Sequence, residues 1–279
     1  MLSVIIAAYN EERRLPETLR KVAAFLSSRS MEHEIIVVDD GSVDSTTPVA
    51  LELALSWPAI SIIRYERNRG KGFALRTGVL ASRGDRVLIS DADLSTPIEE
   101  ISLLLALIDE NRCDVAIGSR ALAMSMIIKR QPLWRQGMGR MFNRIVRFLV
   151  LDGFSDTQCG FKLFAGEIAR RLFAGARIDR FAFDVEILAL ALQQGYRVQE
   201  APIRWINSPV STVHPVRDSL QMLKDLVRIR LALGLVRLHA PKPVERPLNP
   251  QGIVSFAPSR LREGRRISTK PLKPGFGKD

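Results

Sequence analysis

The sequence predicts an α/β protein whose central sheet is mostly parallel and is flanked by helices. Short, continuous apolar runs alternate along the chain with segments in which apolar residues recur at helical spacing. Such runs are typical of strands buried on both faces, and their alternation with helices is typical of parallel sheets. Polar residues directly follow several of the runs, and ligands of such sheets bind at the carboxyl ends of the strands.

The strands are predicted from the apolar runs, in order along the chain. The first run, SVIIAA, covers 3–8 and ends in the polar stretch YNEE. Pro202 lacks a backbone donor, so the run 197–203 that contains it predicts an edge strand. The remaining strands are predicted over 34–38, 60–63, 87–89 and 114–120.

Helices are predicted where apolar residues recur three or four positions apart. The segments 135–151 and 218–238 predict amphipathic helices with Lys and Arg beside an apolar face. The segment 122–133 has no clear period, is rich in Met and Ile, and predicts a mobile apolar loop. The other helices are predicted over 15–26, 44–56, 71–81, 98–111 and 181–194.

The 279-residue chain carries a net charge of +11, which favours an anionic partner such as nucleic acid, an acidic membrane surface or a phosphorylated substrate. Residues 241–279 hold nine Lys and Arg against three Asp and Glu, are rich in Pro and Gly, and predict a disordered basic tail. We therefore expect a folded domain over 1–240 and a tail over 241–279. Because the domain is only mildly basic and its cations are not interleaved with aromatics, nucleic acid is not the expected partner.

The two cysteines, Cys113 and Cys159, lie far apart in the sequence and form neither a disulfide framework nor a zinc motif. The three histidines lack ligand spacing, which also argues against zinc. This cysteine usage suits a reducing compartment. The N-terminal apolar run lacks the features of a signal peptide and is too short to span a bilayer, so we expect no membrane span.

Two carboxylates, Asp91 and Asp93, directly follow the apolar run 87–89. In an extended chain their side chains point to the same face, so they repel each other unless a cation lies between them. A hard divalent cation such as Mg²⁺ or Mn²⁺ prefers oxygen ligands and binds through one or two carboxylates plus substrate phosphates. The pattern predicts a metal site that holds a diphosphate, and the alternative is a solvated turn that caps the next helix.

Two further polar stretches follow strand ends in the same way. Asp39 and Asp40 come after the run 34–38, at a position where an acidic residue commonly bonds a nucleoside. Lys71 lies between two glycines at the start of the helix 71–81, where free N–H groups attract phosphate. A helix-capping turn and a solvated lysine are the alternatives for these two stretches.

Seven motifs occur in a specific order: AYNE (8–11), VDDGS (38–42), RGKG (69–72), DADLSTP (91–97), GSR (118–120), DTQCGFK (156–162) and FDVE (183–186). As a set they resemble the family-two inverting glycosyltransferases with the GT-A fold, over roughly residues 1–235. The later motifs resemble the dolichyl-phosphate β-glucosyltransferase branch, whereas mannosyl-transferring relatives typically carry Gln in place of Ser95. Ala8 departs from the usual Pro of the family.

The resemblance implies roles for the matched residues. Arg120 and Arg135 would meet the phosphate of the acceptor, with Lys71 or Lys162 as a further anion contact, and Asp184 would orient the site or pair with a neighbouring cation. The residues implied to bind the nucleotide sugar are Ala8, Tyr9, Glu11, Asp39, Asp40, Lys71, Asp91, Ala92 and Asp93. The residues implied to hold Mg²⁺ or Mn²⁺ are Asp91, Asp93 and Ser95. The residues implied to be catalytic are Asp93, Arg120, Arg135 and Asp184.

The resemblance further implies inverting transfer of glucose from UDP-glucose to a polyprenyl phosphate of the dolichyl type, giving a β-linked lipid phosphate. The acceptor oxygen is already ionised at neutral pH, so a site poor in histidine suffices. With the same fold, GDP-mannose or UDP-N-acetylglucosamine as donor, or a saccharide as acceptor, are alternatives. A basic nucleic-acid-binding protein is the alternative of a different class.

A polyprenyl acceptor stays in the bilayer, so the enzyme must reach the membrane surface. The segments 122–133, 135–151 and 218–238 combine apolar faces with Lys and Arg, a composition typical of interfacial helices. From the resemblance we expect the N-terminal anchor of eukaryotic relatives to be absent here. We therefore expect peripheral attachment through these segments, on the cytoplasmic side of a membrane.

Overall fold

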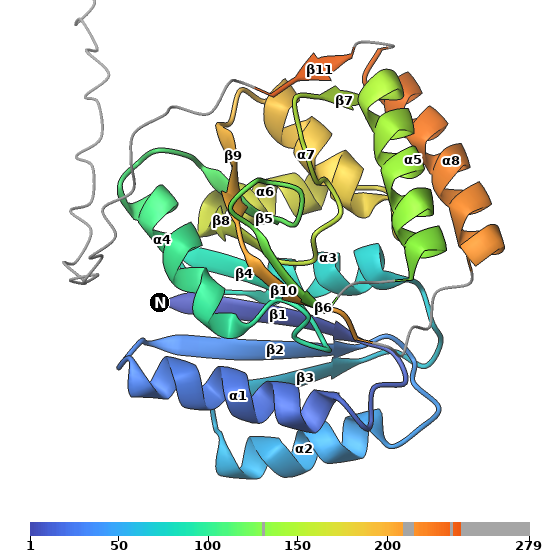
Figure 1. Ribbon diagram of the computed structural model, residues 1–279. Helices are drawn as coiled ribbons and strands as arrows, with labels where there is room; N and C mark the ends of the chain where they lie inside the picture. The colour runs from blue at the N-terminus through green and yellow to red at the C-terminus, as the bar shows by residue number, and fades with distance from the viewer. Residues whose placement is uncertain (130–131, 209–214, 235–236, 241–279) are drawn as a thin grey trace, which may run out of the picture. The chain divides into compact units, whose positions relative to one another are not determined.

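The computed structural model describes residues 1–129, 132–208, 215–234 and 237–240. At its centre is a seven-stranded sheet in the order β3-β2-β1-β4-β8-β5-β9 (Figure 1). Its neighbouring strands are parallel except at β8, which is antiparallel to both β4 and β5. The predicted, mostly parallel sheet is thus confirmed. Its strands are β1 (Leu2–Ala8), β2 (His33–Asp39), β3 (Ile60–Arg64), β4 (Arg86–Asp91), β5 (Val115–Ser119), β8 (Lys162–Ala165) and β9 (Val198–Pro202).

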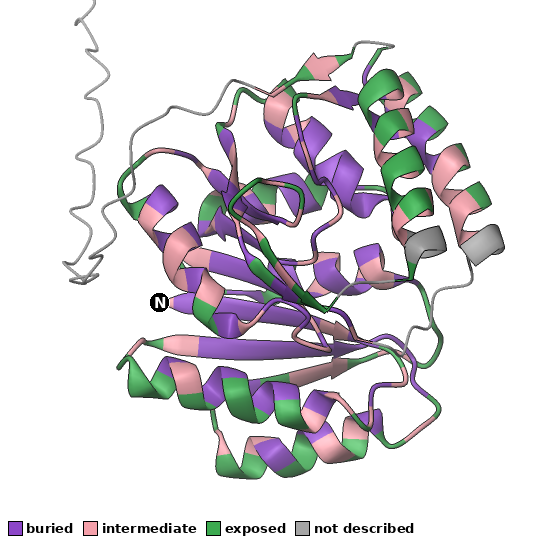
Figure 2. Cartoon of the chain, viewed as in Figure 1, coloured by how far each residue is buried: buried purple, intermediate pink, exposed green. Residues whose placement is uncertain are grey.

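Helices cover both faces of this sheet (Figure 1). One face packs against α1 (Leu15–Ser28), α2 (Thr46–Ser56) and α4 (Ile101–Asp109), the last preceded by a short 3₁₀ helix, η1 (Ile98–Glu100). The other face packs against α3 (Lys71–Ala81), α6 (Gly166–Gly175) and α7 (Phe183–Gln193). The three-layer arrangement buries the inner strands of the sheet, whereas its edge strands β3 and β9 are partly exposed (Figure 2).

The alternation of side chains along β1 explains why its apolar run is continuous. Val4 and Ile6 belong to the core beneath α1, and Ile5 belongs to the core beneath α3. All three are fully buried, and each such side chain stabilises the fold by about 1.5–3 kcal/mol. A strand that lies between two helical layers therefore needs apolar residues at successive positions.

Two long helices, α5 (Leu133–Leu149) and α8 (Pro215–Ala232), lie side by side at one end of the molecule (Figure 1). Val146 of α5 and Leu226 of α8 are buried in the core that also contains α3 and α7. The opposite faces of both helices are exposed (Figure 2). The predicted amphipathic character of both helices is confirmed, although α8 ends at Ala232, earlier than predicted.

Two small parallel sheets join distant segments. β6 (Met126–Lys129) pairs with β10 (Arg204–Ile206), and β7 (Leu151–Asp152) pairs with β11 (Leu238–His239). The prediction that 122–133 is a loop throughout is therefore wrong, because β6 gains its partner from a strand far along the chain. The prediction of an edge strand near Pro202 is confirmed, since β9 ends the main sheet.

The predicted tail over 241–279 lies outside the described residues, so the boundary at 240 stays a prediction. Among the residues that the structure describes, no helix has both the length and the apolar composition needed to cross a bilayer.

Candidate active site

The carboxyl ends of β1, β2 and β4 meet at one edge of the sheet. In the strand register Ala8 lies opposite Asp39, and Ala7 lies opposite Asp91. The polar stretches after these strands therefore leave the sheet next to one another, as the sequence predicts. This is the edge at which parallel α/β sheets bind ligands.

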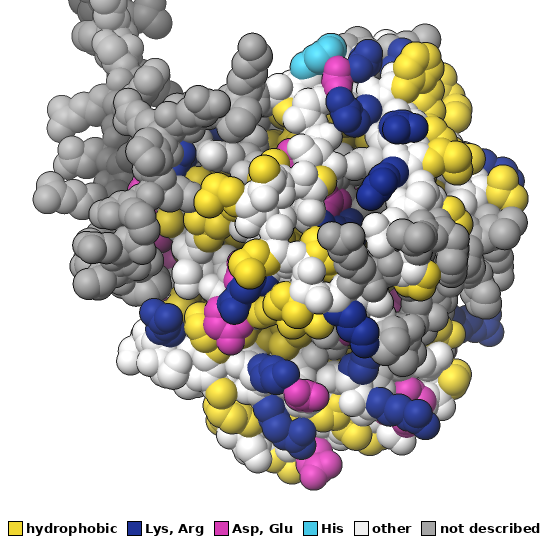
Figure 3. Space-filling view, viewed as in Figure 1, with side chains coloured by type: hydrophobic (Ala, Val, Ile, Leu, Met, Phe, Trp, Pro, Cys, Tyr) yellow, Lys and Arg dark blue, Asp and Glu magenta, His cyan; other side chains and the backbone are white. Residues whose placement is uncertain are grey.

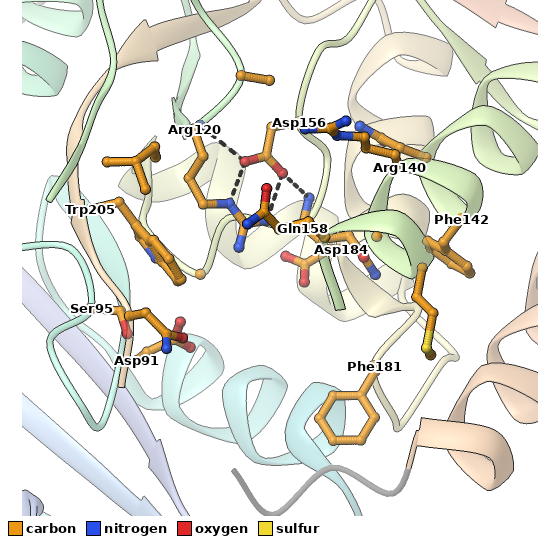
Figure 4. Close-up of a pocket in the computed structure, with 18 of the residues that line it drawn as sticks. Asp91, Ser95, Arg120, Arg140, Phe142, Asp156, Gln158, Phe181, Asp184 and Trp205 are labelled. Carbon is orange, nitrogen blue, oxygen red and sulfur yellow. Dashed lines mark hydrogen bonds and ion pairs between the residues drawn. The ribbon is translucent and has the colours of Figure 1, made fainter. Parts of the chain in front are cut away.

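A cavity of about 840 Å³ opens at this edge (Figure 4). Asp91 at the end of β4 and Asp93 and Ser95 in the turn after it belong to its lining, and α5 and α8 contribute side chains from another part of the chain. Other segments add four charged residues to the lining: Lys71, Arg120, Asp156 and Asp184. Three of these four, all except Asp156, are predicted site residues, and Asp156 belongs to the motif 156–162.

Asp91 and Lys71 form an ion pair in the cavity, with 2.5 Å between the Asp91 Oδ1 and Lys71 Nζ atoms. Gly70, which precedes Lys71, has a φ of +112°, and a Cβ there would lie 2.4 Å from the carbonyl oxygen of Asp179. Only glycine fits this turn, which positions Lys71. Burial alone would raise the pKa of the Asp91 carboxyl, but the charge of Lys71 holds that pKa below its usual value. Asp91 is therefore ionised at neutral pH.

Asp93 makes a backbone hydrogen bond and a longer ion pair than Asp91 does. Its Oδ1 atom accepts a hydrogen bond from the backbone N–H of Ser95 at 3.0 Å, and its Oδ2 atom lies 3.5 Å from Nη1 of Arg14. Arg14 also donates from Nε to the Glu11 carboxylate at 2.6 Å. Burial raises the pKa of the Glu11 carboxyl. Arg14 thus connects Glu11, which follows β1, with the carboxylate that follows β4.

Gly160 packs directly on the Asp91 carboxylate. A Cβ at this position would lie 2.1 Å from Asp91 Oδ2 and 2.3 Å from Oδ1, so even alanine requires the carboxylate to move. We expect Gly160→Ala to lower kcat by about 100-fold, because displacements near 1 Å cost that much at a reacting centre. Steady-state kinetics of the purified variant measure this effect. Gly175→Ala is the control, because its Cβ would meet only Leu190 Cδ1 at 3.9 Å; equal activity of the two variants would contradict the prediction.

Arg120 forms a bidentate ion pair with Asp156. Its Nε and Nη2 atoms lie 2.6 Å and 2.9 Å from the two carboxylate oxygens (Figure 4). Glu200 of β9 in turn accepts the backbone N–H groups of Ser155 and Asp156 at 2.8 Å and 2.9 Å. The Arg120 guanidinium also lies 5.6 Å from the ring centroid of Trp205. Burial would raise the pKa of Asp156, but Arg120 keeps that pKa low, so the pair is charged and largely self-neutralised.

Asp184 forms a second buried ion pair beneath the cavity. Its Oδ1 atom lies 2.5 Å from the Lys162 ammonium, and the two side chains are only 6% and 1% exposed. Burial raises the pKa of Asp184 despite this partner. Glu186 instead accepts the backbone N–H groups of Arg177 and Ile178 at the loop before α7. Glu186 therefore holds a loop and does not face the cavity.

The carboxylates implied to hold the nucleoside do not line this cavity. Asp39 accepts the backbone N–H of Ser42 at 2.9 Å, and Asp40 accepts those of Arg69 and Gly70, each at 2.8 Å. Burial raises the pKa of Asp40. Both carboxylates thus organise the turns at this edge of the sheet, and their contact with a nucleoside stays a prediction.

The remaining predicted residues of this edge contribute backbone and surface. Ala8 and Ala92 are buried, and their carbonyl oxygens accept hydrogen bonds from the backbone N–H of Asp40 and the hydroxyl of Thr18. Tyr9 is 36% exposed beside them. These contacts fix the strand ends, and direct ligand contact stays a prediction.

Sequence reasoning missed the residues that α5, α8 and β10 bring to the cavity. The side chain of Arg135 lies outside the described part of the structure, but Arg140, one turn beyond it, lines the cavity. Apolar lining residues come from the same region: Met138, Phe142, Met222 and Trp205. The available signal was only the amphipathic pattern of the two helices, which does not show what their inner faces meet.

The mostly parallel sheet and the paired carboxylates beside the cavity fit the expected GT-A class of glycosyltransferases. The family model of Glycosyl transferase family 2 matches residues 3–173, and the chain belongs to this family. A dolichyl-phosphate β-glucosyltransferase of Dictyostelium discoideum is 39% identical over 252 residues, which cover 86% of this chain and 77% of the relative. The human protein of the same name is 37% identical over 252 residues, covering 85% and 78%. The resemblance to this branch is confirmed.

Solved structures agree on the fold. Glucosyl-3-phosphoglycerate synthase from Mycobacterium tuberculosis, in complex with Mn²⁺, UDP-glucose and phosphoglyceric acid, has a TM-score of 0.60 at 16% identity and covers 83% of this chain and 79% of its own. Mannosyl-3-phosphoglycerate synthase from Rubrobacter xylanophilus has a TM-score of 0.62 at 17% identity, with coverage of 88% and 78%. These likenesses establish the GT-A fold.

Proposed function

We propose that this protein transfers glucose from UDP-glucose to a polyprenyl phosphate of the dolichyl type, with inversion at the anomeric carbon. The observation that carries the proposal is the 39% identity, over 86% of the chain, with a relative named for that glucosyl transfer. The name of that relative does not specify UDP as the nucleotide or the length of the lipid. Transfer assays with a panel of nucleotide sugars test the nucleotide.

We propose that Asp91, Asp93 and Ser95 hold Mg²⁺ or Mn²⁺ together with the donor diphosphate. These three residues line the same cavity and offer only oxygen ligands, which suits a hard cation. Among the described residues no group of three or more His, Cys, Asp and Glu encloses a metal position. Substrate phosphates would therefore complete the ligand set, as is common for Mg²⁺. When bound, the ion would neutralise charge that develops on the leaving diphosphate.

The reaction needs no general base from the protein. A phosphate oxygen of the acceptor attacks the anomeric carbon, the new C–O bond forms as the bond to the diphosphate breaks, and UDP leaves with the electron pair. The attacking oxygen is already ionised, and no histidine lines the cavity in the part of the chain that the structure describes. Asp184 is paired with Lys162, so we assign it to positioning rather than to proton transfer.

Lys71 supplies positive charge on the donor side. Its ammonium is part of the cavity lining and contacts Asp91, next to the proposed diphosphate position. A cation there lowers the repulsion between the leaving diphosphate and the approaching acceptor phosphate. Arg120 lines the same space, where Asp156 fixes its orientation and neutralises most of its charge.

We propose that the exposed faces of α5 and α8 bind the surface of a membrane on its cytoplasmic side. Phe148 is 74% exposed and Leu231 is 61% exposed. Figure 3 shows hydrophobic side chains beside Lys and Arg in the region of these helices, a combination that favours an anionic lipid surface. An enzyme with a polyprenyl acceptor requires such a surface.

We expect Phe148→Ser with Leu231→Ser to lower vesicle binding by about tenfold or more, because each change removes apolar area that would enter the lipid. Flotation with vesicles that contain anionic phospholipid measures the bound fraction. Leu55→Ser is the control, since Leu55 is 86% exposed but lies on α2. Undiminished flotation of the double variant would refute this membrane face.

The function is tested with purified protein, Mn²⁺, a short polyprenyl phosphate and a panel of radiolabelled nucleotide sugars. We expect label to enter the organic phase from UDP-glucose. Transfer from GDP-mannose or UDP-N-acetylglucosamine instead would show that the proposed donor is wrong. Labelling of an added saccharide would show that the proposed acceptor is wrong. The absence of transfer from every donor would refute the proposal.

A further inference from the structure

The cations that line the cavity differ in whether a carboxylate already neutralises them. Lys71 is paired with Asp91 at 2.5 Å, and Arg120 is paired with Asp156 through two hydrogen bonds. Arg140 lines the same cavity from α5, yet among the described residues its side chain has no hydrogen bond or ion pair. Arg140 is therefore the described lining cation whose charge remains uncompensated.

Apolar side chains form another part of the cavity lining. Met138 and Phe142 of α5 line it together with Met222 of α8. Residues four apart lie on the same face of a helix, so Met138 and Phe142 form an apolar strip, whereas Arg140, two residues from each, lies on the side of α5 that carries Asn143, which also lines the cavity. A cavity that offers a cation at one place and an apolar strip at another suits a ligand with an anionic head and an apolar chain.

The donor side of the cavity is distinct from this wall. The acidic pair after β4 and Lys71 belong to the sheet edge, whereas Arg140, Met138 and Met222 belong to α5 and α8. A second phosphate that entered at the sheet edge would meet the carboxylates of Asp91 and Asp93, which repel it. The helical wall instead offers it the guanidinium of Arg140, which forms no ion pair with the described residues.

We propose that Arg140 binds the phosphate of the acceptor and that Met138, Phe142 and Met222 contact its first isoprenyl units. This inference rests on the proposed function, which supplies the acceptor class. It assigns the main phosphate contact to Arg140 rather than to Arg120, because Asp156 already neutralises Arg120. It also separates the two features of the acceptor: Arg140 recognises any phosphate monoester, and the apolar strip selects a lipid one.

The test compares Arg140→Ala with Arg20→Ala, which removes the same charge from an exposed position of α1 and does not line the cavity. Citronellyl phosphate, a short prenyl phosphate, is the acceptor and UDP-glucose the donor. We expect Arg140→Ala to raise the acceptor KM by about 10- to 100-fold, the usual effect of losing a charge-assisted hydrogen bond, with the donor KM unchanged. Arg140→Lys should recover part of the loss, and Arg20→Ala should leave both constants unchanged.

A second variant tests recognition of the acceptor's isoprenyl chain separately from recognition of its phosphate. Met138→Gln should raise the KM for citronellyl phosphate but leave inhibition by inorganic phosphate unchanged, whereas Arg140→Ala should weaken both. An unchanged acceptor KM in Arg140→Ala, or equal effects of Arg140→Ala and Arg20→Ala, would overturn the inference.

Calorimetric titration of citronellyl phosphate into the protein with UDP and Mn²⁺ keeps this result distinct from the proposed function. If the wild-type protein binds the lipid phosphate but transfers no sugar from UDP-glucose, the proposed donor is wrong, and the loss of binding in Arg140→Ala still supports the inference. If the wild-type protein does not bind the lipid phosphate, both the inference about Arg140 and the proposed acceptor are wrong.

Discussion

Replacing Asp93 with Asn is expected to lower kcat/KM by about 10³-fold or more, because the variant loses the charge that we propose holds the metal and the donor diphosphate. The fold should survive. The Asp93 side chain is 20% exposed, accepts one hydrogen bond from the Ser95 backbone and lies 3.5 Å from Arg14. Replacing its carboxylate therefore leaves few polar groups without a hydrogen-bond partner. Initial rates and a thermal melt of the same preparation measure both quantities.

Asp85→Asn provides the matched control for this prediction. Asp85 precedes β4, at the strand end opposite Asp93, and pairs with the N-terminal amine at 3.0 Å on the surface. It should retain normal turnover. Near-normal turnover of Asp93→Asn would remove Asp93 from the proposed metal site.

Lys162→Met is expected to have the largest effect on stability. It leaves the Asp184 carboxylate without its partner in a place where that side chain is only 6% exposed. Breaking a buried ion pair on one side costs about 3–5 kcal/mol, which lowers the Tm of a domain of this size by roughly 6–20 °C. Differential scanning calorimetry measures the change.

Lys162→Met combined with Asp184→Leu should recover most of this stability, since an apolar pair leaves no uncompensated charge. The two single variants and the double variant form a thermodynamic cycle that isolates the pair. If the double variant were destabilised by the sum of the single effects, the two side chains would not be coupled as the structure places them.

Much of the fold could be predicted because its signals are local. The apolar runs of β1, β2 and β4 and the helical spacing of α1 and α3 are complete within each segment. β8 was not predicted, since four residues, KLFA, carry no period of their own and become a strand only between β4 and β5. α6 did have a signal that was overlooked, the apolar spacing of Ala169, Leu172 and Phe173.

The site could be predicted in part for the same reason. Asp91 and Asp93 stand out because they directly follow a buried run, and the strand order then brings them beside β1 and β2. The pairing of Arg120 with Asp156 spans 36 residues, and the approach of Gly160 to Asp91 joins two motifs. Such contacts depend on tertiary packing, which no local pattern contains.

The most direct test of the central claim is a crystal of the protein soaked with Mn²⁺ and UDP-glucose, with anomalous diffraction recorded for manganese. We predict one anomalous peak within ligand distance of the Asp93 carboxylate, with the diphosphate of the donor bound to the same ion. Ordered UDP-glucose at another place, or an ion-free turn after β4 beside bound donor, would contradict the account.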